Sequence, residues 1–232
     1  MTRKISEDFT LLKSFIEEYT LSETITDPQF SNLLKGFHKS YYAYLSLILH
    51  LEHKEAWPNE EQLYRFKESC SDMGQALFLM CHGTYKAANL LARSSIENFI
   101  KGLGYQVNPN IINEGSVYKV FEIARGFKEC KSPNFISLFD QLHTEYGNLC
   151  RFTHTSTFKE MEQVTALKSL LSVDHQKAKN LVSTIKRILN SYLLILIWTY
   201  RDIFFSFHVD VRDNILMPIS GKNRLEIFSG LE

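Results

Sequence analysis

Apolar residues recur every three to four positions along most of the chain, which is the spacing of one face of an α-helix. This spacing predicts helices over about residues 7–21 and 28–51, from 60 onward, and over 73–103, 117–127, 132–154, 161–171 and 174–207. No segment alternates apolar and polar residues with the period of two that is typical of a strand. The sequence therefore predicts an all-α fold, a single helical bundle of six to eight helices.

Capping residues support several of these boundaries. Asp27 followed by Pro28 is typical of an N-cap and a first helical turn, and Ser132 followed by Pro133 repeats this arrangement. We expect residues 1–60 to form an N-terminal helical layer that packs on a core bundle of residues 61–208. Residues 209–232 are predicted to be a tail that either caps the bundle or is mobile.

The last predicted helix changes character along its length. Its first half has one apolar stripe, whereas the stretch from Ile188 to Tyr200 is apolar all round. Such a helix has to be covered on every side, either at the centre of the bundle or in a homodimer interface, and the sequence leaves both alternatives open. The stretch is shorter than the ~20 residues that span a bilayer, and Arg201 and Asp202 close it, so we expect no membrane segment.

Charge and cysteine usage narrow the functional classes. The 232 residues contain 26 Lys and Arg and 26 Asp and Glu, a balance that excludes a globally basic nucleic-acid binder but leaves room for a local basic patch. The cysteines form no C-x-x-C pair, and no apolar run follows the N-terminus as it would in a secretory signal. We therefore expect a cytoplasmic protein.

The familiar phosphate-loop, dinucleotide, hydrolase and zinc-protease motifs do not occur, and we expect no cofactor.

A first group of candidate residues is a polar stripe inside the apolar 73–103 helix. Its members are spaced by three or four residues and so share one face: His82, Lys86, Asn89, Arg93, Glu97 and Lys101. The stripe is either a solvated face with surface ion pairs or an internal Arg93–Glu97 network that orients a site residue on a neighbouring helix. Ligand contacts would then come from Lys86 and Asn89, together with Tyr146 on the later helix.

The second candidate is the end of the helix over 132–154. Arg151 and His154 are one turn apart, and such a pair can hold a phosphate and move a proton at neutral pH. The alternative is a histidine that only interacts with the carboxyl end of its helix. His143, Cys150 and His154 share a face but span about 16 Å along the axis, too far for one zinc ion, so no metal site is predicted.

A third candidate is the pair Arg201 and His208. Seven residues separate their positions, so both lie on nearly the same side of a helix that continues to residue 207. The pair either forms a site or only ends a buried helix, with His208 capping its last turn.

Two of these segments together resemble the HEPN-like helical family (higher eukaryotes and prokaryotes nucleotide-binding). The resemblance covers residues 73–157, and its pattern is R-S-x-x-E followed by Y-x-x-L-C-x-x-x-H-x-S. The matching residues are Arg93, Ser94 and Glu97, then Tyr146, Leu149, Cys150, His154 and Ser156.

The resemblance implies an all-α bundle that dimerises and belongs to a microbial defence or toxin system. Many members of the family are metal-independent ribonucleases with R-x(4–6)-H, in which the arginine binds phosphate and the histidine acts as acid and base at a dimer cleft. Here no arginine stands at that spacing before His154, whereas Arg201 and His208 fit R-x6-H. The alternatives are a catalytically silent module that binds RNA, a nucleotide or a partner protein, and a helical interaction protein outside this family.

Overall fold

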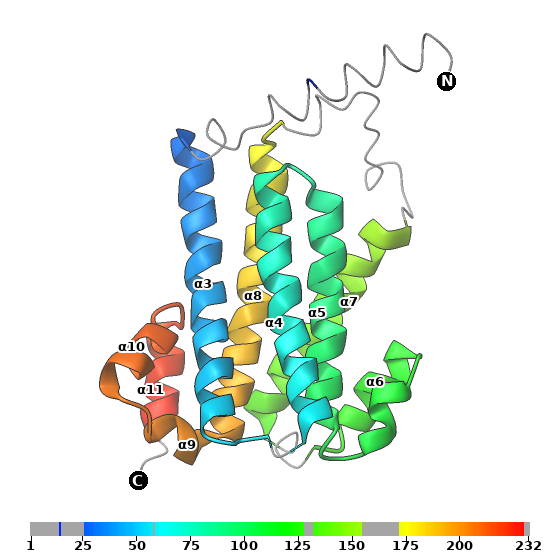
Figure 1. The fold of residues 1–232 in the computed structure, drawn as a ribbon, viewed down its shortest axis with the longest axis vertical. Helices are drawn as coiled ribbons and strands as arrows, with labels where there is room; N and C mark the ends of the chain where they lie inside the picture. Colours follow the sequence, from blue (N-terminus) through cyan, green and yellow to red (C-terminus); the bar gives the residue numbers. More distant parts are fainter. Residues whose placement is uncertain (1–13, 15–25, 58, 128–131, 155–171, 230–232) are drawn as a thin grey trace.

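The computed structural model describes residues 14, 26–57, 59–127, 132–154 and 172–229. Within these ranges it contains nine α-helices, one short 3-10 helix and no strand, so the predicted all-α bundle is confirmed (Figure 1). Apart from residue 14, the helices predicted over 7–21 and 161–171 lie outside the described residues. The long helices are α3 (Pro28–His53), α4 (Glu60–Cys81), α5 (Tyr85–Gly104), α7 (Pro133–His154) and α8 (His175–Thr199).

The shorter elements lie at the lower end of the bundle in Figure 1. They are η1 (Pro109–Asn113), α6 (Val117–Ala124), α9 (Arg201–Phe205), α10 (Val209–Leu216) and α11 (Gly221–Ser229). Within the segment predicted as a tail, the side chains of Ile215, Leu216, Ile219 and Ile227 are buried and join the hydrophobic core. Residues 209–229 therefore cover one side of the bundle, where α10 packs against α3.

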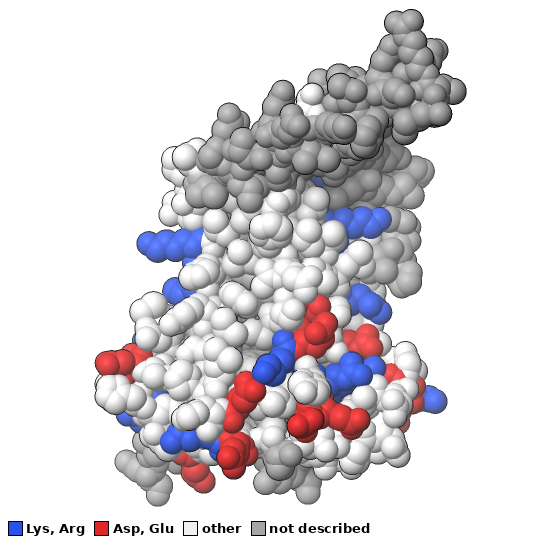
Figure 2. Space-filling model, in the orientation of Figure 1, with Lys and Arg blue, Asp and Glu red and all other residues white. Residues whose placement is uncertain are grey.

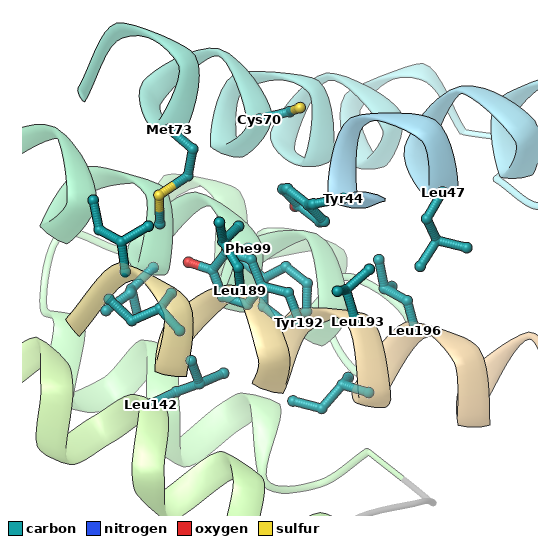
Figure 3. Close-up of a cluster of buried hydrophobic side chains, with 14 of the residues drawn as sticks. Tyr44, Leu47, Cys70, Met73, Phe99, Leu142, Leu189, Tyr192, Leu193 and Leu196 are labelled. Atoms are coloured by element: carbon teal, nitrogen blue, oxygen red, sulfur yellow. The ribbon is translucent and has the colours of Figure 1, made fainter. Parts of the chain in front are cut away.

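Helix α8 lies at the centre of the bundle, where it contacts α3, α5 and α7. Every residue from Ile188 to Ile197 except Asn190 is buried, and Figure 3 shows Tyr192 of α8 close to Phe99 of α5 and Tyr44 of α3. The Phe99 and Tyr192 rings are stacked, with centroids 3.9 Å apart. The bundle itself thus covers the helix that is apolar all round.

The length and hydropathy of α8 would also fit a membrane span. It is the one helix in the described ranges that meets both criteria, and 67% of its most apolar stretch is buried inside the bundle. Because α8 is buried in the bundle, its apolar character is explained by its place as a core helix.

Two predicted helices are interrupted. The pattern over 73–103 belongs to α4 and α5, which are separated by a turn in which Gly83 has a left-handed φ of 69°. In this turn the Thr84 hydroxyl donates to the backbone carbonyl of Leu79, one of the last carbonyls of α4, which have no hydrogen-bond partner within the helix. His82 is therefore the C-cap of α4 and not part of the polar stripe on α5, which corrects the sequence prediction.

The helix predicted over 174–207 ends at Thr199 and resumes as α9 after Tyr200. The Tyr200 hydroxyl accepts hydrogen bonds from Trp57 Nε1 at 2.7 Å and from Gln106 Nε2 at 2.9 Å. These two bonds tie Tyr200 to the loops at the lower end of the bundle, where its backbone leaves the helical conformation (φ −113°, ψ 40°).

Candidate functional site

The middle of α5 carries polar side chains that contact neighbouring helices. Arg93 lies half-buried between α5 and α7, where Nε donates to the Cys150 thiol at 3.3 Å and Nη2 donates to the Tyr146 hydroxyl. Its guanidinium carbon also lies 4.8 Å from the centre of the Tyr146 ring. The structure thus brings Arg93 together with two residues of the resemblance, Tyr146 and Cys150, that lie more than 50 positions later in the sequence.

The electrostatics of this contact hold Arg93 in its charged form. Burial lowers the pKa of Arg93, but the hydrogen bond to Cys150 and the nearby Tyr146 and Glu97 outweigh it and raise the pKa. Burial also raises the pKa of Tyr146, and the charge of Arg93 opposes this shift only in part. Because the guanidinium donates to two α7 side chains and lies on the Tyr146 ring, it links two helices and is poorly placed to hold a phosphate.

The other stripe residues on α5 have mixed environments. Glu97 forms an ion pair with Lys101 at 3.2 Å, and the Lys101 side chain is 9% exposed. Asn89 is buried, whereas Lys86 is half-buried one turn nearer the start of α5. Of the predicted ligand contacts, the structure therefore joins only Tyr146 to Arg93 within the described residues.

Two further α5 residues, which sequence reasoning missed, bind α4 and α8. Ser95 Oγ donates to the Ser69 carbonyl at 2.8 Å and lies 3.3 Å from the Tyr192 hydroxyl. Asn98 Nδ2 donates to Asp72 at 3.2 Å. Burial raises the pKa of Asp72, and hydrogen bonds from Ser94 and Asn98 oppose this rise. The spacing of three residues from Ser69 to Asp72 and from Ser95 to Asn98, within apolar faces, is the signal that indicates such a network.

The structure describes the Arg151 and His154 pair, at the end of α7, only in part. Arg151 is exposed on the last turn, and His154 is the final residue of the helix. The side chain of His154 lies outside the described residues, as does Ser156 of the resemblance. The predicted pairing of Arg151 with His154 therefore stays a prediction.

Arg201 and His208 occupy different surroundings. Arg201 is half-buried, and its Nη2 donates to the Ile227 carbonyl at 2.7 Å, which ties α9 to α11. His208 is the N-cap of α10, and its Nδ1 accepts from the Asp210 backbone N–H at 3.4 Å. No hydrogen bond or ion pair joins Arg201 to His208 in the described part of the chain. Their spacing fits R-x6-H, but the two residues do not share one helix, because α9 ends at Phe205 and α10 begins at Val209.

An open groove of about 620 Å³ runs along the first half of α8. Its walls come from α3, α7, α8, the segment between α10 and α11, and the first turn of α11. Its lining residues are Leu33, Gln141, Lys179, Val182, Ser183, Lys186, Arg187, Asn190, Pro218, Ser220 and Asn223. Three of these are cations and none is acidic, so the groove presents positive charge and hydrogen-bond donors to solvent.

One groove cation is held in place by a buried carboxylate. Glu145 is 5% exposed, and its two oxygens accept from Arg187 Nε at 2.5 Å and Nη2 at 3.3 Å. Within the described ranges no ion pair involves Lys179 or Lys186, so their charges are not neutralised by a carboxylate. Sequence reasoning missed this groove, although α8 carries four Lys and Arg and no Asp or Glu.

Comparisons with known proteins add no assignment: no protein-family model, curated protein or solved structure matches the chain. In the described ranges no three His, Cys, Asp or Glu side chains are grouped so that they could hold a metal ion. The candidate site therefore rests on the α5 network and the α8 groove.

Proposed function

We propose that the protein is a catalytically silent helical module that binds RNA along the α8 groove. The observation that carries the proposal is an open groove lined by Lys179, Lys186 and Arg187 with no acidic side chain. A phosphate backbone is the polyanion that such a surface attracts, because each lysine or arginine that meets a phosphate releases counterions from the strand. RNA is the nucleic acid expected from the HEPN-like resemblance, as is a place in a microbial defence or toxin system.

The spacing of the groove cations favours a strand over a single phosphate. Lys179 and Lys186 are seven residues apart on α8, which corresponds to about 10 Å along the helix axis. The two ammonium groups would therefore meet different phosphates of one chain. Uncharged donors in the same groove, on Gln141, Asn190 and Asn223, would bind riboses or base edges.

The same observations give the ribonuclease alternative less support. Arg93 donates to Tyr146 and Cys150, and Arg201 donates to the Ile227 carbonyl, so both guanidinium groups already have protein partners in the described part of the chain. Cleavage would then depend on Arg151 and His154 at the end of α7. The proposed module needs neither residue.

The experiment is a binding titration of a fluorescently labelled single-stranded RNA of about 15 nucleotides, followed by anisotropy. We expect K179E/K186E to weaken binding at least 10-fold, because two attractive phosphate contacts become repulsive. The matched control is K54E/K119E, which changes the charge equally at two exposed lysines near the opposite end of the bundle. Equal affinities of the two variants would contradict the proposed groove.

The RNA is recovered after each titration and its length is measured on a gel. Intact RNA is the expected result. If the RNA is cut and H154A abolishes the cutting, the module is not silent and the ribonuclease alternative replaces the proposal.

A further inference from the structure

A smaller pocket, of about 310 Å³, opens at the lower end of the bundle between the start of α7, the end of α8, α9 and α11. Its volume is at the lower end of the ~300–1,000 Å³ that is typical of small-ligand pockets. We call it the Trp198 pocket, and its lining residues are Ser132, Asn134, Phe135, Trp198, Arg201 and Glu226. The pocket therefore combines an aromatic ring with a cation, a carboxylate and an amide.

The Trp198 pocket lies on the line along which α7 and α8 pack. The Ser191 hydroxyl of α8 donates to Gln141 Oε1 of α7 at 3.3 Å. Seven residues further along α8 is Trp198, and seven residues back along α7 is Asn134, and both line the pocket. Positions seven residues apart share one side of a helix. Because Gln141 also lines the α8 groove, the groove and the pocket follow one another along the same line.

Helix α11 contributes to both cavities. Asn223 in its first turn lines the α8 groove, and Glu226, almost one turn later, lines the Trp198 pocket. On α8, Trp198 lies eleven residues beyond Arg187 of the groove, which corresponds to about 16 Å along the helix axis. A strand that meets the groove cations therefore reaches the pocket when it continues along α8.

The two tryptophans of the chain have different surroundings. Trp57 is 5% exposed, its ring stacks on Phe66, and its Nε1 donates to the Tyr200 hydroxyl. Trp198 is half-buried, and within the described ranges its indole N–H has no acceptor and its ring stacks on no other ring. Tryptophan N–H groups usually find a partner when buried. The Trp198 indole thus offers a flat apolar surface and a donor to a ligand in the pocket.

The two charged groups of the pocket keep part of their hydrogen-bonding capacity. Arg201 Nη2 donates to the Ile227 carbonyl, and the guanidinium carbon lies 5.3 Å from the centre of the Phe205 ring. Among the described residues, Nε and Nη1 of Arg201 have no acceptor. The one ion pair of Glu226 in the same ranges is with Lys222 at 4.0 Å, and that lysine side chain is 86% exposed. Arg201 therefore offers two donors, and Glu226 two acceptors, to a ligand.

We propose that the Trp198 pocket binds a guanine base of the single-stranded RNA in the α8 groove, an inference that rests on the proposed function. Proteins recognise unpaired bases by stacking them on aromatic rings and by hydrogen bonds to their edges. Guanine has two acceptors, O6 and N7, on one edge and two donors, N1–H and the N2 amino group, on another, and no other RNA base has both. Arg201 binds the first edge, Glu226 binds the second, and Trp198 stacks on the ring.

A pocket with a similar set of residues lies on the outer side of α4 and serves as a control. It has a volume of about 360 Å³, and its lining residues are Glu61, Tyr64, Arg65, Glu68 and Ile112. Its arginine is bound through two nitrogens, to Asn98 and to the Ile112 carbonyl. Figure 2 shows the acidic side chains of this view gathered in its lower half, where α4 begins. Two glutamates and an occupied arginine do not attract a phosphate strand, so we expect no base there.

The test is fluorescence anisotropy of the full chain with labelled oligouridines of about 15 nucleotides that carry one central guanine or one central adenine. We expect the wild type to bind the guanine strand at least about 5-fold more tightly than the adenine strand. E226Q should abolish this preference, because an amide no longer accepts from two donors, and should keep the affinity for the adenine strand. The matched control is E61Q on α4, which should keep the preference.

W198A tests the stacking contact. It should weaken the binding of the guanine strand at least about 5-fold, because base–aromatic stacking is lost. Circular dichroism shows whether this variant keeps its helix content. E226Q changes one partly exposed side chain and decides the question alone if W198A does not fold.

The outcomes separate the pocket from the groove. Equal affinities of the wild type for the two strands, or a guanine preference that E226Q leaves intact, would overturn the guanine pocket, while K179E/K186E still tests the groove. No binding of either strand would overturn both. Free guanosine monophosphate, which lacks the groove contacts, should displace the guanine strand only at millimolar concentration. Displacement at micromolar concentration would assign the pocket to a free nucleotide and overturn the proposal.

Discussion

Replacing Phe99 with alanine is expected to lower the free energy of unfolding by about 3–5 kcal/mol. The Phe99 ring is fully buried in α5, stacked on Tyr192 at 3.9 Å and edge-on to Phe66 at 5.6 Å. Truncation removes these contacts and leaves a cavity among rings that are themselves fully buried. The neighbouring Ser95–Tyr192 contact at 3.3 Å depends on the same packing.

The measurement is urea denaturation followed by circular dichroism, with Tyr118→Ala as the control. Tyr118 is 73% exposed, so its truncation should change the free energy of unfolding by no more than about 0.5 kcal/mol. Similar losses for the two variants would mean that the Phe99–Tyr192 stack is not the centre of the core.

Replacing Arg187 with leucine is expected to lower the free energy of unfolding by about 2 kcal/mol, below the ~3–5 kcal/mol typical of a fully buried pair. The Glu145 side chain is 7% exposed and would lose the guanidinium that it binds with both oxygens. The loss is reduced because the Arg187 side chain is 44% exposed, so water reaches the carboxylate once the arginine is gone.

A double variant separates this effect from a simple loss of packing. R187L/E145L removes both charges, and we expect it to recover most of the stability that R187L loses. The same urea titration measures the three variants. A double variant less stable than R187L would contradict a stranded carboxylate as the cause.

Local spacing was sufficient to predict most of the helices, but for α8 it left two alternatives, a central helix and a dimer interface. The turn at Gly83 was not predicted, because apolar positions keep a spacing of three to four residues from the end of α4 into α5. The break at Tyr200 depends on hydrogen bonds from Trp57 and Gln106, which lie far away in the sequence. Such partners leave no periodic signal.

Only one part of the candidate site could be predicted from the sequence, namely the contact between residues of the family-like motif. Arg93 and Tyr146 belong to the two halves of the resemblance, and they meet across α5 and α7. The groove, in contrast, needs α3, α7, α8 and Asn223 to come together, which no local pattern specifies. The absence of acidic residues from α8 was the one signal in the sequence, and the neutral total charge hid it.

The salt dependence of RNA binding tests the central claim most directly, because it counts the phosphates that the groove neutralises. The affinity of the single-stranded RNA is measured between 50 and 200 mM salt for the wild type and for K179A/K186A. Each lost phosphate contact should reduce the slope of log K against log salt by about 0.7, so the variant should differ from the wild type by about 1.4. Identical slopes, or no RNA binding by the wild type at 50 mM salt, would contradict the account.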